Sequence, residues 1–189
     1  MVIGITGTSG AGKNTVVDYL IEKHGFKHYS SREFIRAEVA KRGLADNRDS
    51  MMLVANDMRA AHSASYIIEH LWREARTAGG DAVIESIRTV GEVEFLRRHA
   101  DFKLIAVTAD PKTRYERNVK RGSSTDHVSF DHFLEQEKQE MASVNPNKQN
   151  LHATMSSANF VIYNDGTLPE LWAQVESVLQ KIMTAEKRN

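Results

Sequence analysis

Residues 7–15 read Gly7-Thr8-Ser9-Gly10-Ala11-Gly12-Lys13-Asn14-Thr15, and the spacing of Gly7, Gly12 and Lys13 is that of a phosphate-binding P-loop. A β-branched run over residues 2–6 precedes this loop, and apolar residues at helical spacing follow it. This strand, loop and helix context argues against a glycine-rich turn that binds nothing. The glycines let successive backbone N–H groups turn toward one anion, and Lys13 can reach the β- and γ-phosphates of a nucleotide. The segment therefore predicts an ATP site.

Two residues are candidates for organising Mg²⁺. Asn14 follows the lysine, where many P-loops carry a hydroxyl that binds the metal, so we expect the next residue, Thr15, to contact phosphate or a metal-bound water. Glu85 ends the apolar run Ala82-Val83-Ile84, and a carboxylate there can orient Mg²⁺ or its waters. A simple strand-end cap is the alternative for Glu85. The sequence thus predicts ATP together with Mg²⁺.

Strand and helix patterns alternate along the chain. Short apolar runs predict strands over 2–6, 81–85, 102–107 and 160–163, and a further short strand is predicted over 26–29. Helical spacing predicts helices that end near Gly25, Gly43, Gly79 and Gly122, and others over about 90–99, 129–141 and 168–182. Residues 44–60 are predicted as loop with a short helix, and 142–158 as polar and unperiodic. The alternation indicates one α/β domain over 1–189, with a mostly parallel sheet covered on both faces.

Composition narrows the functional classes. The 189 residues hold 25 Lys plus Arg and 25 Asp plus Glu, so no overall field draws the chain to nucleic acid or to an anionic membrane. The lack of cysteine excludes disulfides, thiolate zinc sites and cysteine nucleophiles, and the eight histidines show no tight ligand spacing. No apolar run approaches the roughly 20 residues of a spanning helix, and the P-loop begins too early for a signal peptide. We expect a cytoplasmic monomer or homodimer whose partners are small-molecule nucleotides.

Arginines follow two other predicted strands, where an acceptor phosphate would lie. Arg32 and Arg36 are one turn apart on the helix after the second strand, and Arg88 lies three residues beyond Glu85. Guanidinium groups present a fork of donors that suits phosphate, and phosphoryl transfer needs cations for donor and acceptor alike. We therefore expect Arg36 and Arg88 to bind the acceptor. Solvated surface arginines are the alternative.

A third group, Arg114, Arg117 and Arg121, recurs at i, i+3 and i+7 and so shares one helix face. Small residues follow at 122–125. This pattern predicts a short lid over about 114–130 whose arginines neutralise charge in the transition state. A plain charged helix face is the alternative.

Further segments carry a family resemblance. They are Ser31-Arg32-Glu33-Phe34-Ile35-Arg36, Glu85-Ser86-Ile87-Arg88, Arg114-Tyr115-Glu116-Arg117 and Asn164-Asp165-Gly166-Thr167. With the P-loop, they resemble the nucleoside monophosphate kinase superfamily over nearly the whole chain. That superfamily includes adenylate kinases, deoxynucleoside monophosphate kinases and dephospho-CoA kinase, and the segment Asn56-Asp57-Met58-Arg59 resembles archaeal relatives. The long zinc-type lid of many adenylate kinases is absent, and Tyr29-Ser30-Ser31-Arg32 replaces the aspartate-rich motif of dephospho-CoA kinase.

The resemblance implies a P-loop NTPase fold: a three-layer α/β sandwich around a five-stranded parallel sheet of order 2-3-1-4-5, with a monophosphate-binding insert over about 30–75 and a short lid. It implies transfer of the γ-phosphoryl of Mg-ATP to a nucleoside or deoxynucleoside monophosphate. The implied roles are acceptor binding by Ser31, Arg32, Arg36 and Arg88, cofactor binding by Arg117, Asp165 and Gly166, and catalysis by Lys13, Arg88, Arg114, Arg117 and Arg121. A kinase of dephospho-CoA or another small metabolite, and a nucleotide-binding regulatory module with little transfer activity, are the alternatives.

Overall fold

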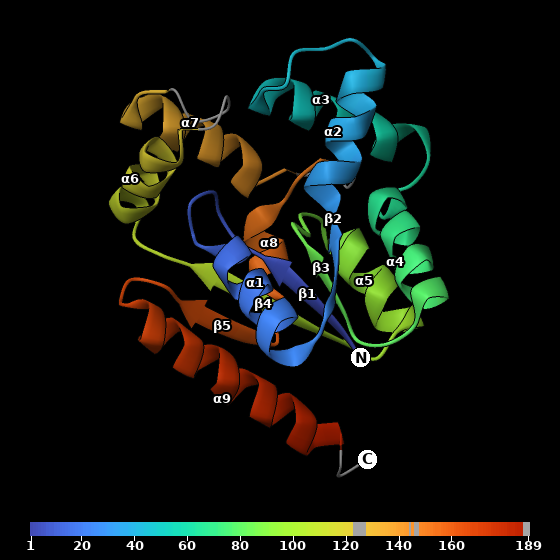
Figure 1. Cartoon of the computed structure of the whole chain (residues 1–189). Helices are drawn as coiled ribbons and strands as arrows, with labels where there is room; N and C mark the ends of the chain where they lie inside the picture. Colours follow the sequence, from blue (N-terminus) through green and yellow to red (C-terminus); the bar gives the residue numbers. More distant parts are fainter. Residues whose placement is uncertain (123–127, 144, 146–147, 187–189) are drawn as a thin grey trace.

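A parallel sheet forms the centre of the molecule. The computed structural model describes residues 1–122, 128–143, 145 and 148–186, and in them five strands follow the order β2-β3-β1-β4-β5 (Figure 1). The strands are β1 (Val2–Thr6), β2 (Lys27–Ser30), β3 (Ala82–Glu85), β4 (Phe102–Thr108) and β5 (Phe160–Tyr163). Every pairing between neighbours is parallel. The predicted sheet and its strand order are confirmed.

Helices connect the strands and return the chain to the same end of the sheet. They are α1 (Lys13–His24), α2 (Ser31–Lys41), α3 (Arg48–Ala61), α4 (Tyr66–Ala78), α5 (Val90–His99), α6 (Pro111–Arg121), α7 (Phe130–Met141), α8 (Leu151–Ser156) and α9 (Leu168–Glu186). The carboxyl ends of all five strands therefore meet at one edge, where ligands of open α/β sheets bind. Within the described residues, none of these helices combines the length and hydropathy that crossing a membrane requires.

Strand side chains alternate between the two faces of the sheet, which divides the core in two. Ile3 and Ile5 of β1 are fully buried in the cluster that includes α1 and α9. Ile84 of β3 and Leu104 of β4 are buried in the opposite cluster, which includes α4 and α5. Two helical layers thus cover one sheet (Figure 1), and this confirms the predicted three-layer sandwich.

Helix α3 is the main difference from the sequence prediction, which gives residues 44–60 mostly as loop. The structure has a helix of 14 residues, begun by Asn47, whose side chain accepts a hydrogen bond from the Ser50 N–H at 2.9 Å. Val54 is buried in the core, whereas Met51 and Met52 line a cavity described below. Met51, Val54 and Met58 share the buried side of the helix, whereas Leu53, in the same apolar run, is exposed on the opposite side, and this obscures the period.

Helix α8 is a second difference, because 142–158 is predicted as unperiodic. Asn150 begins this helix and accepts a hydrogen bond from the Ala153 N–H at 3.0 Å. Leu151 and Thr154 are buried. A helix of six residues is too short to show a period in the sequence.

Four helices stand at the carboxyl end of the sheet around the P-loop. Figure 1 shows α2 and α3 on one side and α6 and α7 on the other. The insert predicted over about 30–75 contains α2, α3 and part of α4. The lid predicted over about 114–130 contains most of α6, but its residues 123–127 lie outside the described residues. Insert and lid therefore stay predictions.

Candidate functional site

The P-loop joins β1 to α1 in a conformation that requires glycine. Gly10 and Gly12 have φ angles of +78° and +90°, in the left-handed region that other residues rarely adopt. A Cβ atom on Gly10 would collide with the backbone of Arg114, and one on Gly12 with the side chain of Asn164. Close packing against α6 and the segment after β5 is thus the steric reason for these glycines.

Hydrogen-bond donors in the P-loop and at the start of α1 lack partners among the described residues. α1 begins at Lys13 with no side-chain cap, so the N–H groups of its first turn have no acceptor within the helix. The buried hydroxyl of Thr8 has no hydrogen-bond partner in the described part of the chain. Lys13 Nζ folds back and donates to the Thr8 carbonyl oxygen at 2.8 Å. Unpartnered donors at a helix N-terminus fit the phosphates of a nucleotide.

The surroundings of Lys13 lower its pKa. Desolvation is the largest cause and the Arg88 guanidinium adds to it, whereas the carboxylates of Glu85 and Glu140 act in the opposite direction. The pKa falls from 10.5 to about 7. The amine is therefore only partly charged near neutral pH, and a bound polyphosphate would restore its charge.

ATP binding at pH 8 is expected to take up close to one proton per nucleotide. Lys13 is mostly neutral in the free protein above its pKa of about 7, and an adjacent polyphosphate raises that pKa again. The affinity for ATP should accordingly fall as pH rises above about 7. Calorimetric titrations in two buffers of different ionisation enthalpy measure the uptake. The variant Lys13→Arg, which stays protonated, is the control and should show none; wild-type binding without proton uptake would contradict the lowered pKa.

Helix α6 is fastened to the P-loop through Ser9. Arg114 is buried and donates to the carbonyl oxygens of Ala109 at 2.8 Å and Ser9 at 3.3 Å. It also pairs with the carboxylate of Glu137 on α7. Asn118 Nδ2 donates to the Ser9 hydroxyl at 3.1 Å. These contacts give Arg114 a positioning role, and it does not line the cavity beside the loop, although the sequence predicts it to be catalytic.

The other two arginines of α6 are placed differently. Arg121 lines the cavity, and its Nη2 donates to Asn118 Oδ1 at 3.2 Å. Arg117 is half-buried, and its buried Nη1 has no hydrogen-bond partner among the described residues. An unpartnered guanidinium nitrogen suits an anionic ligand. Contact of Arg117 and Arg121 with nucleotide phosphates stays a prediction.

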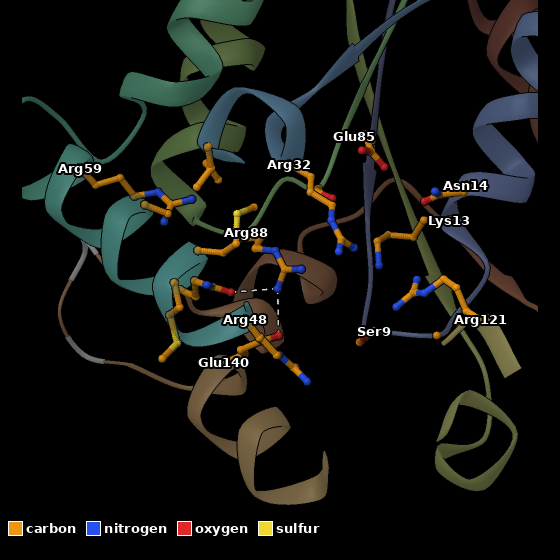
Figure 2. Close-up of a pocket in the computed structure, with 17 residues that line it drawn as sticks. Ser9, Lys13, Asn14, Arg32, Arg48, Arg59, Glu85, Arg88, Arg121 and Glu140 are labelled. Atoms are coloured by element: carbon orange, nitrogen blue, oxygen red, sulfur yellow. Dashed lines mark hydrogen bonds and ion pairs between the residues drawn. The ribbon is translucent and has the colours of Figure 1, made fainter. Parts of the chain in front are cut away.

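A cavity that is open to solvent adjoins the P-loop (Figure 2). Six of its lining residues are basic and two are acidic, although the whole chain has no net charge. This local excess of positive charge favours anions. The basic residues are Lys13, Arg32, Arg48, Arg59, Arg88 and Arg121, and the acidic ones are Glu85 and Glu140.

Glu140 of α7 joins two of these arginines. Its Oε2 accepts a hydrogen bond from Arg88 Nη1 at 2.9 Å, and its Oε1 accepts one from Arg48 Nε at 2.7 Å (Figure 2). Arg88 Nη1 also donates to Gln149 Oε1 at 2.9 Å. Burial alone would raise the pKa of Glu140, but the charges of Arg88 and Arg48 outweigh it and lower the pKa to about 2. The ionised carboxylate holds both guanidinium groups at one end of the cavity.

The turn after β3 brings Arg88 to the P-loop. Ser86 has a φ of +63°, an uncommon value for a residue other than glycine, and such strained turns gather at functional sites. Thr6 of β1 donates from Oγ1 to the carbonyl oxygen of Ile87 at 2.7 Å. The turn is thus held against the strand that enters the P-loop.

Glu85 supplies a carboxylate beside the P-loop. It is buried at the end of β3, lines the same cavity as Lys13, and accepts a hydrogen bond from Ser30 Oγ at 2.6 Å. The described residues contain no cluster of three or more acidic or histidine side chains that could hold an ion alone. Mg²⁺ at phosphate sites takes one or two carboxylates with phosphate oxygens and water, and the Glu85 carboxylate fits this donor set. Thr15 is not among the residues that line the cavity, so its contact with a metal-bound water stays a prediction.

Two predicted acceptor residues lie outside the cavity wall. Ser31 is buried and donates to the backbone carbonyl of Glu85 at 2.8 Å, so it ties α2 to β3. Arg36 forms exposed ion pairs with Glu33 at 3.1 Å and Asp46 at 3.3 Å. Arg32, one turn earlier on α2, does line the cavity.

The loop after β5 lies against the P-loop. Asn164 is buried, and its Nδ2 donates to the carbonyl oxygen of Ala11 at 2.9 Å. Asp165 Oδ1 accepts a hydrogen bond from the Asp110 N–H at 2.7 Å, and Gly166 is exposed. The structure brings Asp165 and Gly166 near the P-loop, and their contact with the adenine stays a prediction.

Sequence reasoning assigns no site role to Arg48, Arg59 or Glu140. Arg48 and Arg59 lie on α3, in the segment predicted mostly as loop, and only the resemblance of 56–59 to archaeal relatives marks Arg59. Glu140 lies on a predicted helix, but no pattern indicates that it faces a cavity.

Known proteins share this architecture. Residues 3–144 match the family model described as AAA domain. A UPF0200 protein of Pyrobaculum aerophilum is 31% identical over 183 residues, which cover 96% of this chain and 98% of that one. A shikimate kinase from Bacteroides thetaiotaomicron has a TM-score of 0.55 at 13% identity, over 97% of this chain and 98% of its own. A gluconokinase from Sinorhizobium meliloti has a TM-score of 0.56 at 14% identity, over 97% and 96%. The fold is therefore that of P-loop kinases.

Proposed function

This chain belongs to the AAA domain family and to the UPF0200 family, and we propose that it transfers the γ-phosphoryl group of Mg-ATP to a nucleoside or deoxynucleoside monophosphate. The observation that carries the proposal is a group of arginines in the cavity beside the P-loop. Arg32, Arg48 and Arg88 come from separate elements and line one cavity with Lys13. A module that only binds ATP has no use for these arginines, whereas a kinase needs them for an acceptor phosphate.

The proposed chemistry is a direct in-line transfer. An oxygen of the acceptor phosphate attacks the γ-phosphorus while the bond from that phosphorus to the bridging β–γ oxygen breaks, and ADP leaves with the bond's electron pair. Lys13 and the P-loop N–H groups hold the donor, and Arg88 and Arg48 hold the acceptor. Mg²⁺, which Glu85 and Thr15 would hold through water, supplies charge neutralisation on the phosphates when bound. The protein's part is alignment and electrostatic stabilisation.

Arg88→Ala is expected to lower kcat/KM for the acceptor about 10- to 100-fold and to leave the KM for ATP nearly unchanged. The variant loses charge-assisted hydrogen bonds to the acceptor phosphate, which are worth roughly 1.5–3 kcal/mol. Steady-state kinetics with each substrate varied in turn measures both constants. Arg98→Ala is the control, because Arg98 is exposed on α5 and pairs only loosely with Glu94, at 3.8 Å.

The same assay separates two assignments of the acceptor site. Sequence reasoning predicts a loss in Arg36→Ala, whereas the position of Arg36 outside the cavity favours a larger loss in Arg88→Ala. An unchanged acceptor KM and kcat in Arg88→Ala would remove Arg88 from the site.

An acceptor screen tests the function itself. Wild-type protein is incubated with ATP, Mg²⁺ and each common nucleoside or deoxynucleoside monophosphate, and ADP formation is compared with a reaction that lacks acceptor. Dephospho-CoA, shikimate and gluconate form the other arms. Turnover of one of these with no nucleotide turned over would replace the proposal by a metabolite kinase. ATP binding without phosphorylated product from any acceptor would favour a regulatory module.

A further inference from the structure

Arg59 of α3 has a buried guanidinium nitrogen for which the described part of the chain offers no partner. The residue is 2% exposed, and its Nε and Nη2 donate to Glu92 Oε1 at 3.1 and 2.9 Å. Its Nη1 is buried and has no hydrogen-bond partner among the described residues. A buried donor that makes no hydrogen bond lowers the stability of the fold by about 1–3 kcal/mol. Such a group indicates that something else accepts its hydrogen bond.

The side chain of Arg59 reaches the cavity beside the P-loop. Arg59 is one of the lining residues, and Figure 2 shows it extending from α3 toward the other labelled arginines. Arg48, Met52, Ala55 and Arg59 are spaced by four, three and four residues, so they share one face of α3. All four line the cavity. One helix face therefore forms a wall that runs from the Arg48 end to the Arg59 end, about three turns away.

The wall between these two arginines is apolar. Met51, Met52 and Ala55 of α3 and Ile35 of α2 line it. A ring system can pack against such side chains, with methionine adapting to its shape. The Arg48 end, in contrast, carries Arg88 and Glu140 and favours phosphate. The cavity thus has a charged end and an apolar end, and Arg59, with its buried and unpartnered Nη1, lines the apolar end.

We propose that Arg59 reads a ring carbonyl of the acceptor, so that the substrates are monophosphates of keto bases. This inference rests on the proposed function. With the phosphate at the Arg88 end, Arg59 meets the base edge opposite the sugar, and its Nη1 donates to O6 of guanine or hypoxanthine, or to O4 of uracil or thymine. Adenine and cytosine carry an amino group at that place. A guanidinium has no acceptor, so an amino group there leaves two donors facing each other.

Glu92 holds the Arg59 guanidinium in position to contact the ring of the acceptor. Its Oε1 takes both bonds from Arg59, while its Oε2 accepts from the backbone N–H groups of Arg88 at 2.7 Å and Thr89 at 3.0 Å. One carboxylate therefore joins the ring end of the cavity to the turn that carries Arg88. Arg59 is a specificity-determining residue in this arrangement.

The test uses pairs of substrates that differ at one ring position. Inosine and adenosine monophosphates form one pair, and uridine and cytidine monophosphates form the other. Affinity is measured by calorimetry on protein saturated with Mg²⁺ and a non-hydrolysable ATP analogue, and kcat/KM is measured from ADP formation with ATP. At least one pair should show a keto preference of about tenfold or more, as expected when a site that donates to an oxygen meets an analogue lacking it.

Arg59→Lys should abolish this preference. Lysine keeps a positive charge beside Glu92, but its one nitrogen cannot both pair with the carboxylate and reach the ring. Arg42→Lys is the matched control, since Arg42 pairs with Asp57 of α3 at 3.1 Å on the exposed surface. It should keep the wild-type ratios. If Arg59→Lys does not fold, the wild-type ratios alone decide.

The outcomes separate this inference from the function it rests on. Transfer with equal use of both members of each pair, or with a preference that Arg59→Lys retains, would overturn the role of Arg59 and leave the kinase function standing. A keto preference in binding with no transfer would support Arg59 and overturn the function. Failure to bind these four monophosphates, their deoxy forms, guanosine monophosphate and thymidine monophosphate would overturn both.

Discussion

Lys13→Ala should lower kcat/KM for phosphoryl transfer about 10³-fold, in line with the loss of one preorganised donor to a developing charge. The ammonium is the only lysine nitrogen that lines the cavity, in the part of the chain that the structure describes. ATP affinity should fall as well, because the P-loop N–H groups alone would then hold the β- and γ-phosphates. Transfer is measured as ADP formed with the best acceptor of the screen, and affinity by calorimetry.

Lys23→Ala is the matched control for this variant. Lys23 lies on the same helix, α1, but is exposed in its last turn. It should leave transfer and ATP affinity within twofold of wild type. Circular dichroism of both variants checks that the fold is kept. Full ATP affinity in Lys13→Ala would show that the loop is not the nucleotide site.

Glu92→Ala should lower the free energy of unfolding by about 3–5 kcal/mol, the range for breaking one partner of a buried ion pair. Glu92 and Arg59 both have side chains 1% exposed, so the variant leaves an uncompensated buried charge. It also removes the capping box, in which Glu92 and Thr89 bond each other's backbone N–H groups at the start of α5. Urea denaturation followed by circular dichroism measures the change.

Glu94→Ala on the same helix is the control. Glu94 is exposed and its contact with Arg98 is an i,i+4 surface pair at 3.8 Å, which contributes at most about 0.5 kcal/mol. Equal stability losses in the two variants would mean that the buried pair adds nothing beyond helix propensity. Because Glu92 also holds the Arg88 turn, Glu92→Ala that still folds should lose acceptor affinity too.

Most of the fold can be predicted from patterns that each span only a few neighbouring residues. The P-loop spacing lies within nine residues and sits between a β-branched run and a helical run. Each predicted strand is a short local segment, in most cases an apolar run, whose position agrees with the structure to within a residue or two, as Phe160–Tyr163 illustrates. The strand order came with the family resemblance rather than with any single pattern. α3 was not predicted because the apolar run over 51–54 includes Leu53, which is exposed on the side opposite the buried face and obscures the helical period.

Local sequence patterns predict less of the candidate site than of the fold. Arg32 and Arg36 look alike in the sequence, since both are arginines on α2 and one turn apart. The two share one face of the helix, so only their positions along α2 separate them: Arg32 in the first turn lines the cavity, whereas Arg36 one turn later forms ion pairs with Glu33 and Asp46. Arg114 fits the pattern of a lid arginine as well as Arg121 does, yet its donors go to Ala109, Ser9 and Glu137.

What can be read directly from the amino acids is the phosphate loop and the alternation of strands and helices, because the physics behind both acts between residues that are neighbours in the chain. The loop 7–15 can therefore be identified as a phosphate-binding loop from the sequence alone. Its glycines turn N–H groups toward an anion, and its lysine supplies a positive charge. Long-range packing settles the rest. It brings Arg48 and Glu140, 92 residues apart, within 2.7 Å and desolvates Lys13, whose pKa falls to about 7. It also leaves Nη1 of Arg59 without a hydrogen-bond partner among the residues that the structure describes. Charge, desolvation and unpaired donors depend on which distant side chains meet, and no local pattern records that.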